Sequence, residues 1–338
     1  MQSMETSDDL QAVWVSLRQE EWSQLGIYER RLASDTVHAV YALLHRPSAQ
    51  VGLALDLPSD IGAGMNEDAA KGFVLRKEWR RETDKVRMTL LLSEERFTDV
   101  FGVLAADILG HIRSSRTVEA GAEALRTRLE HWKRFLKVAG AEGLSTQEQT
   151  GLFGELSVMR YWIAEGGHDP VAVLASWRGP SGANQDFQQA DLVVEVKTST
   201  ANDITRIRVV NERQLDETGL AELILCHLAF DRRSGAGRTL PDLVAEVTGL
   251  LGAGLEGSFT DLLVMAGYHK IHEGRYRSFG YSQRLCSLYG VECGFPRIKQ
   301  SELRSGVSEV SYIVNLSNLA ADPRDLKALG VLLFGDGA

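Results

Sequence analysis

The chain has too few cysteines, too widely spaced, to be built around disulfides or a structural metal. Cys226, Cys286 and Cys293 include no C-x-x-C pair, which excludes the usual zinc spacing and favours a reducing compartment. The sequence also lacks an apolar run long enough to cross a bilayer, and residues 1–11 are polar and acidic. We therefore expect neither a secretion signal nor a membrane anchor, and predict a cytoplasmic protein.

Positive charge is also scarce. The net charge is −9, from 37 Lys and Arg against 46 Asp and Glu, which disfavours a protein that coats DNA over its whole surface. Residues 269–304 depart from this average, because cations outnumber acids there and aromatic residues are interleaved with them. Two interpretations stay open: the stretch contacts phosphates and bases, or it is a sheet edge whose tyrosines lie half in the core.

The rest of the composition is typical of a soluble globular protein, with 44% hydrophobic and 25% charged residues. A length of 338 residues favours more than one domain. The run Gly-Ala-Glu-Gly at 140–143 marks a boundary, so we expect an N-terminal α+β module at 1–143, a core at 144–235 and a C-terminal α+β extension at 236–338. In the first module the patterns predict strands at 37–44, 51–55, 73–75 and 86–92, a loop at 57–66, and helices at 10–17, 97–112 and 118–138.

The most informative stretch is an apolar strand at 191–198 that carries two opposite charges. Strand side chains alternate between faces, so Glu195 and Lys197 point the same way, roughly 6–7 Å apart along the strand. The apolar residues between and before them occupy the other face. Placing two charges in an apolar strand is costly unless a site uses them. The alternative is an ordinary exposed strand face with crossed charges.

Two further acids precede this strand. Asp186 lies in a short strand that turns into it, and the resulting hairpin would bring Asp186 close to Glu195. Asp191 is a rival, but it lies four residues before Glu195, roughly 13 Å along the strand, and is expected in the turn. Glu155 lies on a helix whose start is marked by a capping box at 145–148.

Small residues surround the helical acid. Gly151 and Gly154 each weaken the helix by about 1 kcal/mol relative to alanine. Their presence is explained if another backbone or a phosphate approaches closely at Glu155. The alternative for Glu155 is a solvated surface charge.

Three carboxylates and one lysine at a strand end predict a Mg²⁺ or Mn²⁺ site that cuts phosphodiesters. Mg²⁺ prefers oxygen ligands in an octahedron and keeps several waters. We expect Asp186, Glu195 and the Val196 carbonyl to hold the metal, with Glu155 holding a coordinated water or a second ion. Lys197 would orient the attacking water and stabilise the developing negative charge.

Polar residues that follow the lysine are candidates for substrate binding. Thr198 and Ser199 come directly after it and could donate to a phosphate. Residues 204–210 alternate as a strand that presents Arg206 and Arg208 on one face.

The motifs at 151–156 (GLFGEL), 185–187 (QDF) and 195–198 (EVKT) resemble the PD-(D/E)XK nuclease superfamily, in particular its bacterial phage-defence branch called "PD-(D/E)XK motif protein". The resemblance implies an α/β restriction-endonuclease-like core, with a mixed central sheet flanked by helices, inside a chain that is α+β overall. Gln185 stands where the family usually has a His. In that branch a Gln-Leu follows the lysine, so the resemblance implies that Gln214 positions a ligand or Lys197. A surface glutamine is the alternative.

The resemblance implies a Mg²⁺-dependent DNA endonuclease of a restriction or phage-defence system. Other proteins of a defence operon are expected partners, and a homodimer is compatible with the sequence. Two alternatives remain: a DNA-binding subunit whose nuclease site is dormant or depends on a partner, and a scaffold protein of a defence complex.

Overall fold

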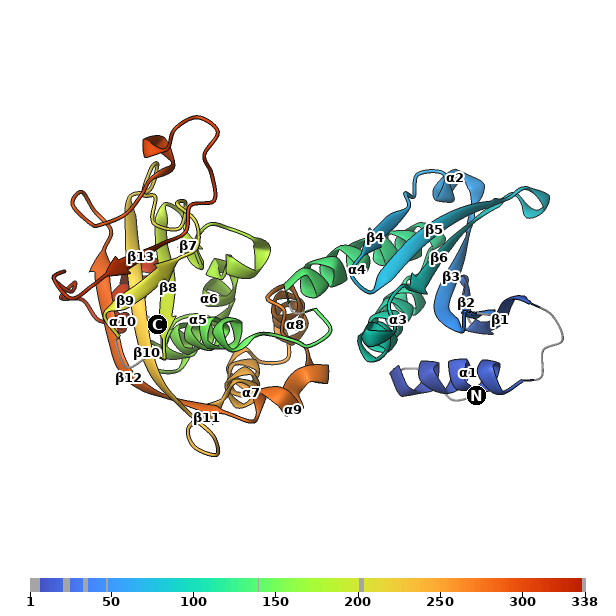
Figure 1. Cartoon of the computed structure of the whole chain (residues 1–338), viewed down its shortest axis with the longest axis horizontal. Coiled ribbons are helices and arrows are strands. Elements are labelled where there is room, and N and C mark those ends of the chain that lie inside the picture. The colour runs from blue at the N-terminus through green and yellow to red at the C-terminus, as the bar shows by residue number, and fades with distance from the viewer. Residues whose placement is uncertain are drawn as a thin grey trace. The chain divides into compact units, whose positions relative to one another are not determined.

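The computed structural model of the chain describes residues 7–20, 25–32, 36–46, 48–138, 140–200 and 204–335. The chain forms two compact units, Met1–Gly143 and Leu144–Ala338 (Figure 1). Each is described by itself below. Among the described helices, none is both long and apolar enough to cross a membrane.

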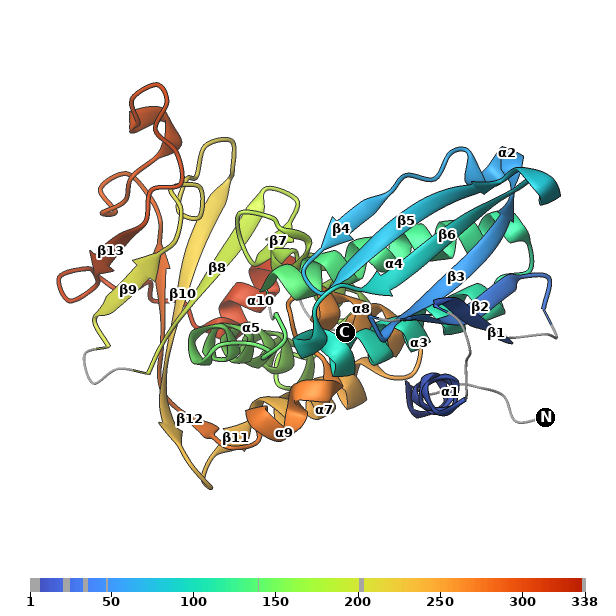
Figure 2. The same ribbon diagram turned by 45° about the vertical axis from the view of Figure 1, so that its right-hand side comes forward.

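The first unit is an antiparallel sheet of six strands in the order β1-β2-β3-β6-β5-β4, with α1, α3 and α4 on one face (Figure 2). Alternate residues of the central strands, such as Val40, Leu53 and Met88, are buried on that face. The helices predicted at 97–112 and 118–138 correspond to α3 and α4. The elements are α1 (Ser7–Gln19), β1 (Gly26–Leu32), β2 (Ala39–Arg46), β3 (Gln50–Pro58), α2 (Ser59–Gly62), β4 (Asp68–Ala70), β5 (Phe73–Arg80), β6 (Lys85–Leu92), α3 (Thr98–Ser114) and α4 (Val118–Val138).

Strand β1 was not predicted, because it is a charged edge strand whose residues are mostly part-exposed. A buried arginine connects it to the sheet interior. Arg87 of β6 is 3% exposed, donates to both carboxylate oxygens of Asp56 on β3 at 2.6 and 2.8 Å, and also pairs with Glu29 of β1. The loop predicted at 57–66 is partly wrong, since β3 continues to Pro58 and the short helix α2 follows.

The second unit contains a mixed, curled sheet in the order β11-β12-β10-β8-β7. Strands β8 and β10 are parallel, and the other pairs are antiparallel. The predicted fold class, a mixed sheet flanked by helices in a chain that is α+β overall, is confirmed. The elements are α5 (Thr146–Ala164), α6 (Pro170–Ser176), β7 (Phe187–Gln189), β8 (Leu192–Ser199), β9 (Arg206–Val209), β10 (Glu222–Arg233), β11 (Arg238–Thr239), α7 (Leu240–Leu251), α8 (Glu256–Met265), α9 (Glu273–Tyr276), β12 (Gly280–Gly290), β13 (Tyr312–Asn315) and α10 (Leu326–Phe334).

Both faces of the central strands are buried, as expected for a sheet with a parallel pair. On one face Val194 and Val196 of β8 join a core built with α5, α6, α7 and α10. On the other face Val193 packs in a second core with β9 and β13, which form a separate two-stranded sheet (Figure 2). Strand β8 therefore carries two different environments on its alternating residues.

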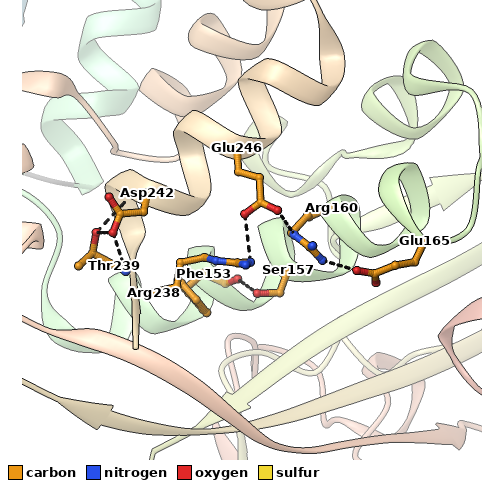
Figure 3. A network of polar contacts seen from close by, with 8 residues as sticks. All are labelled: Phe153, Ser157, Arg160, Glu165, Arg238, Thr239, Asp242 and Glu246. Carbon is orange, nitrogen blue, oxygen red and sulfur yellow. Dashed lines mark hydrogen bonds and ion pairs between the residues drawn. The ribbon is translucent and has the colours of Figure 1, made fainter. Parts of the chain in front are cut away.

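Helix α5 is fixed at its start and along its length. Ser145 caps it, with its side chain accepting from the Glu148 N–H and the Glu148 side chain accepting from the Ser145 N–H, so the predicted capping box is present. Further along, Glu246 of α7 pairs with Arg160 of α5 and with Arg238 of β11 (Figure 3). These contacts join α5, α7 and the edge of the sheet.

Residues after 235 complete the same unit, and the boundary expected between 235 and 236 falls inside it. The reason is β12, which pairs along nearly the whole of β10. The aromatic side chains of the basic stretch mostly belong to the interior: Tyr276, Tyr281 and Tyr289 are 1%, 3% and 8% exposed. The structure therefore favours the interpretation of this stretch as part of a sheet and its core, and not as a stacking platform for bases.

Candidate functional site

The two charges of β8 lie on one face, as the alternation requires. Glu195 is 1% exposed, and its Oε1 lies 2.5 Å from the Nζ of Lys197. Helix α5 packs against the opposite face, where Gly154 closely approaches the Thr198 methyl group. With side-chain exposures of 13% for Lys197 and 1% for Glu195, the pair is largely shielded from solvent, which favours a functional charge pair over the exposed strand face considered as the alternative.

Asp186 sits at the edge of β8, just before β7. Its backbone N–H donates to the Val194 carbonyl at 3.2 Å, and its side-chain Oδ2 accepts from the Val196 N–H at 2.7 Å. Strand β7 begins only at Phe187, opposite Val194. The Asp186 carboxylate therefore takes the place of a strand partner for Val196. Since the N–H and C=O of one strand residue point to the same edge, the Val196 carbonyl also faces the side of Asp186.

Glu155 reaches this edge from α5. Its Oε2 accepts a hydrogen bond from the indole Nε1 of Trp177 at 2.7 Å. A side chain added at Gly179 would lie 2.9 Å from Asp186 Oδ1 and 3.3 Å from Glu155 Oε2, so these two oxygens approach the same point. Trp177 was not singled out from the sequence, and its only signal there is a large aromatic residue at the start of a turn-rich segment.

The cluster is electrostatically unbalanced. Burial and the charges of Asp186 and Glu195 hold the pKa of Glu155 well above its usual range, although the Trp177 hydrogen bond and the charge of Lys197 oppose this. Burial raises the pKa of Asp186 to about 6, although Lys197 and the Val196 N–H oppose this. Burial and the charge of Asp186 raise the pKa of Glu195 to about 8, against the effect of Lys197. Three carboxylates face one ammonium, so the site holds either protons or an added cation.

The carboxylates of the cluster are possible ligands of a divalent metal. Among the residues that the structure describes, no group of three or more His, Cys, Asp or Glu side chains is already arranged around one metal position. However, apart from the ion pair with Lys197, neither Glu195 oxygen has a hydrogen-bond partner in the described part of the chain. Buried carboxylate oxygens without donors, beside two further acids, are hard oxygen ligands of the kind that Mg²⁺ and Mn²⁺ prefer. The residues fit such an ion.

Gln214 contacts the lysine. Its side-chain oxygen accepts from Lys197 Nζ at 2.9 Å and from the Val210 N–H at 3.0 Å. Of the two interpretations of Gln214, the structure therefore favours a role in positioning Lys197. Gln185 donates to the Arg213 carbonyl at 2.9 Å, so it holds the segment that carries Gln214.

The other predicted residues form no hydrogen bond or ion pair with the three carboxylates within the described part of the chain. The Thr198 methyl group faces α5, because Thr198 shares the parity of Val196. The Ser199 hydroxyl is 3.0 Å from Nε2 of His227, a buried ring whose pKa burial lowers to about 4.

Arg206, Arg208 and the rival acid Asp191 are all exposed to solvent, unlike the buried carboxylates of the cluster. Arg206 and Arg208 are exposed on β9, and Arg208 donates to Ser311 at 3.3 Å. Asp191 is exposed in the turn before β8, where its carbonyl accepts from the Ala221 N–H at 2.9 Å.

Comparison with known families identifies the chain. A family model described as "Putative PD-(D/E)XK family member, (DUF4420)" matches residues 10–317, which is most of the chain. No curated protein and no solved structure matches it. The resemblance drawn from the GLFGEL, QDF and EVKT motifs is confirmed, and the chain belongs to this PD-(D/E)XK family, DUF4420.

Proposed function

We propose that the protein is a Mg²⁺-dependent DNA endonuclease that hydrolyses phosphodiester bonds in a bacterial restriction or phage-defence system. Family membership supports a nuclease-type enzyme. The observation that carries the proposal is the buried cluster of Glu155, Asp186, Glu195 and Lys197 at the edge of β8. Burying three acids beside one lysine is unfavourable for the fold alone, and it is explained when a cation and a phosphate complete the site.

The residues have distinct proposed roles. Asp186, Glu195 and the Val196 carbonyl would hold the ion, and Glu155 would border it. When bound, the divalent ion would polarise the scissile phosphate and offset the charge on the leaving oxygen. Lys197, held by Gln214, would place its ammonium beside the phosphate and stabilise the negative charge that develops there.

Substrate contacts belong to the proposal as well. Arg206 and Arg208 are exposed cations that suit the DNA backbone, and Ser199 carries a hydroxyl at the end of β8, the strand of Lys197. Thr198 is the weakest of these candidates, because its methyl group packs against α5. We also propose a cytoplasmic location, proteins of the same defence operon as partners, and a homodimer as an assembly to test.

One observation favours a second candidate, a subunit whose nuclease site is dormant or depends on a partner. The ion pair between Lys197 and Glu195 satisfies the lysine without a substrate. Such a site needs a rearrangement before it binds an ion with Glu195, and a partner protein could supply it.

Two measurements on the purified chain separate these functions. Calorimetric titration with Mn²⁺ reports on the site, and nicking of supercoiled plasmid in Mg²⁺ reports on cleavage. An independent endonuclease binds Mn²⁺ and nicks DNA. A partner-dependent subunit binds Mn²⁺ but nicks only after its operon proteins are added. A chain that neither binds Mn²⁺ nor nicks under either condition is a scaffold, and the proposal is then wrong.

A further inference from the structure

Trp177 and Gly179 adjoin the acid cluster without being acids themselves. We infer that Trp177 is a positioning residue, whose indole N–H fixes the carboxylate of Glu155 at the ion site. Gly179 keeps the space beside that carboxylate open. The inference rests on the proposed function, since it assumes that the cluster binds a divalent cation.

The position of the Trp177 ring is set by packing that does not involve Glu155. Trp177 is 1% exposed and directly follows α6 as its C-cap residue, where its backbone N–H donates to the Leu174 carbonyl at 3.2 Å. It also forms a backbone bridge with Phe187, and its ring lies 6.0 Å from that of Phe259. Contacts from α6, β7 and α8 thus hold the donor in place.

Helix α5 alone does not orient the carboxylate of Glu155. Its side chain has three rotatable bonds, and α5 fixes only its backbone. The indole N–H is a donor that cannot accept, so its partner must be an acceptor, and that acceptor is Glu155 Oε2, 2.7 Å away. The hydrogen bond therefore selects one orientation of the carboxylate, close to Asp186.

Gly179 contributes through the space that it leaves. Its φ is not positive, unlike that of Gly182, so its backbone conformation does not require glycine. A Cβ there would lie 2.9 Å from Asp186 Oδ1, closer than side-chain carbons normally approach. The N–H groups of Arg178 and Gly179 donate to the Asp186 carbonyl at 2.8 and 3.1 Å, so the segment cannot easily move away.

A merely structural role for the Trp177 hydrogen bond is the competing explanation, and Trp162 provides the control. Trp162 is 0% exposed in the same core and donates its indole N–H to the Leu326 carbonyl at 2.9 Å. Replacing either tryptophan with phenylalanine removes one buried hydrogen bond and a similar volume. Only the Trp177 bond ends on a carboxylate of the cluster.

The test compares Trp177→Phe with Trp162→Phe in the full chain, by urea unfolding without metal and by Mn²⁺ calorimetry. Both variants should lose stability without metal. Trp177→Phe should also bind Mn²⁺ about tenfold or more weakly than the wild type, as expected when a group that orients a metal ligand is removed. Trp162→Phe should keep the wild-type affinity. Equal Mn²⁺ affinity in both variants would overturn the positioning role.

A second pair of variants covers the case in which Trp177→Phe does not fold. Gly179→Ala should weaken Mn²⁺ binding, while Gly151→Ala, whose added methyl group meets nothing within 4 Å, should not. An unchanged affinity in Gly179→Ala would contradict the inference. A wild-type chain that binds no Mn²⁺ contradicts the proposed function itself, whereas a wild type that binds and variants that match it contradict only the roles of Trp177 and Gly179.

Discussion

The side-chain oxygen of Gln214 accepts a hydrogen bond from the Nζ of Lys197 at 2.9 Å. The same oxygen accepts from the Val210 N–H at 3.0 Å, so the amide is fixed to the backbone that follows β9. On its other side the ammonium meets Glu195 Oε1 at 2.5 Å. The lysine is therefore held between a neutral acceptor and a buried acid, and its position depends on both.

Removing the neutral acceptor should affect turnover more than metal binding. In Gln214→Ala the ammonium of Lys197 keeps its ion pair with Glu195 but loses the amide that holds its other side. Plasmid nicking should therefore fall about tenfold, which corresponds to about 1.4 kcal/mol of activation free energy. Mn²⁺ affinity measured by calorimetry should change little. Gln188→Ala, an exposed glutamine on β7, is the control and should cleave at the wild-type rate. A Gln214→Ala variant with normal cleavage would show that the hydrogen bond has no role in positioning the lysine.

The acids should be essential for cleavage. Asp186→Ala or Glu195→Ala should abolish Mg²⁺-dependent nicking and reduce Mn²⁺ binding, because each removes carboxylate oxygens from the cluster. Circular dichroism would verify that the fold is retained. The matched control is Asp191→Ala, which removes an exposed acid from the turn before the same strand. Undiminished cleavage by both acid variants would end the assignment of this cluster as a nuclease site.

The lysine should separate turnover from metal binding. Lys197→Ala should lose nicking yet bind Mn²⁺ slightly more tightly, because one neighbouring positive charge is removed and a protonated ammonium is not a ligand. DNA affinity should fall modestly, and its salt dependence should shrink by about one phosphate contact. Calorimetry and a salt series of DNA binding would measure these effects. Loss of Mn²⁺ binding together with unfolding would mean that Lys197 is a structural partner of Glu195.

Stability without metal should depend on pH in a specific direction. The pKa of Glu195 in the fold is about 8, above its ordinary 4.5, and that of Asp186 is about 6, above 3.8. The folded state therefore binds more protons than the unfolded state, so the free energy of unfolding should fall as pH rises from about 5 to 8, by about 1.4 kcal/mol per unit of pKa difference at most. Urea unfolding at several pH values would measure this.

Two variants make the pH prediction specific. Glu195→Gln keeps a neutral side chain of similar shape at every pH, so it should reduce the decline and raise stability at pH 8. Asp191→Asn, in the exposed turn, should leave the decline unchanged. A decline of the same size in all three proteins would assign the pH dependence to other groups. Mn²⁺ binding should show the opposite trend and strengthen as pH rises, since the ion competes with these protons.

The two glycines of α5 should respond oppositely to alanine. At Gly151 an added Cβ meets nothing within 4 Å, so Gly151→Ala should stabilise the protein by about 0.5–1 kcal/mol. At Gly154 the Cβ would lie 2.3 Å from the Thr198 γ-methyl carbon, so Gly154→Ala should destabilise it by about 1–3 kcal/mol. Thermal unfolding of each variant shows whether the substitution raises or lowers the stability of the protein. Stabilisation by both substitutions would show that α5 can shift freely over β8.

Asp186, Glu195 and Lys197 could be predicted because short-range rules govern their relative positions. Strand alternation placed Glu195 with Lys197, and the hairpin turn placed Asp186 beside β8. The same alternation would also have shown that Thr198 shares the face of Val194 and Val196, so its position against α5 was accessible from the sequence.

Features that depend on long-range contacts could not be predicted. Trp177 meets Glu155 across 22 positions, through a turn whose path no local pattern fixes. The pairing of β12 with β10 joins residues 47 to 66 positions apart, from Arg233 with Gly280 to Ile224 with Gly290, so residues after 235 were expected to form a separate extension. The edge strand β1 was missed because its charges find partners such as Arg87 only in the folded sheet.

The hydrogen bond from the Val196 N–H to Asp186 has an evolutionary consequence. Strand β7 stops short of Val196, so an acceptor at position 186 covers the edge of β8 at Val196 whether or not DNA is cut. The Lys197 side chain instead contacts Glu195 and Gln214, and no ladder pairing depends on it. A lineage that abandons cleavage can thus discard Lys197 while it retains Asp or Asn at position 186. Homologues that have lost nuclease activity should therefore be recognised by the absence of this lysine. A conserved aspartate at position 186 does not by itself indicate that a homologue is active.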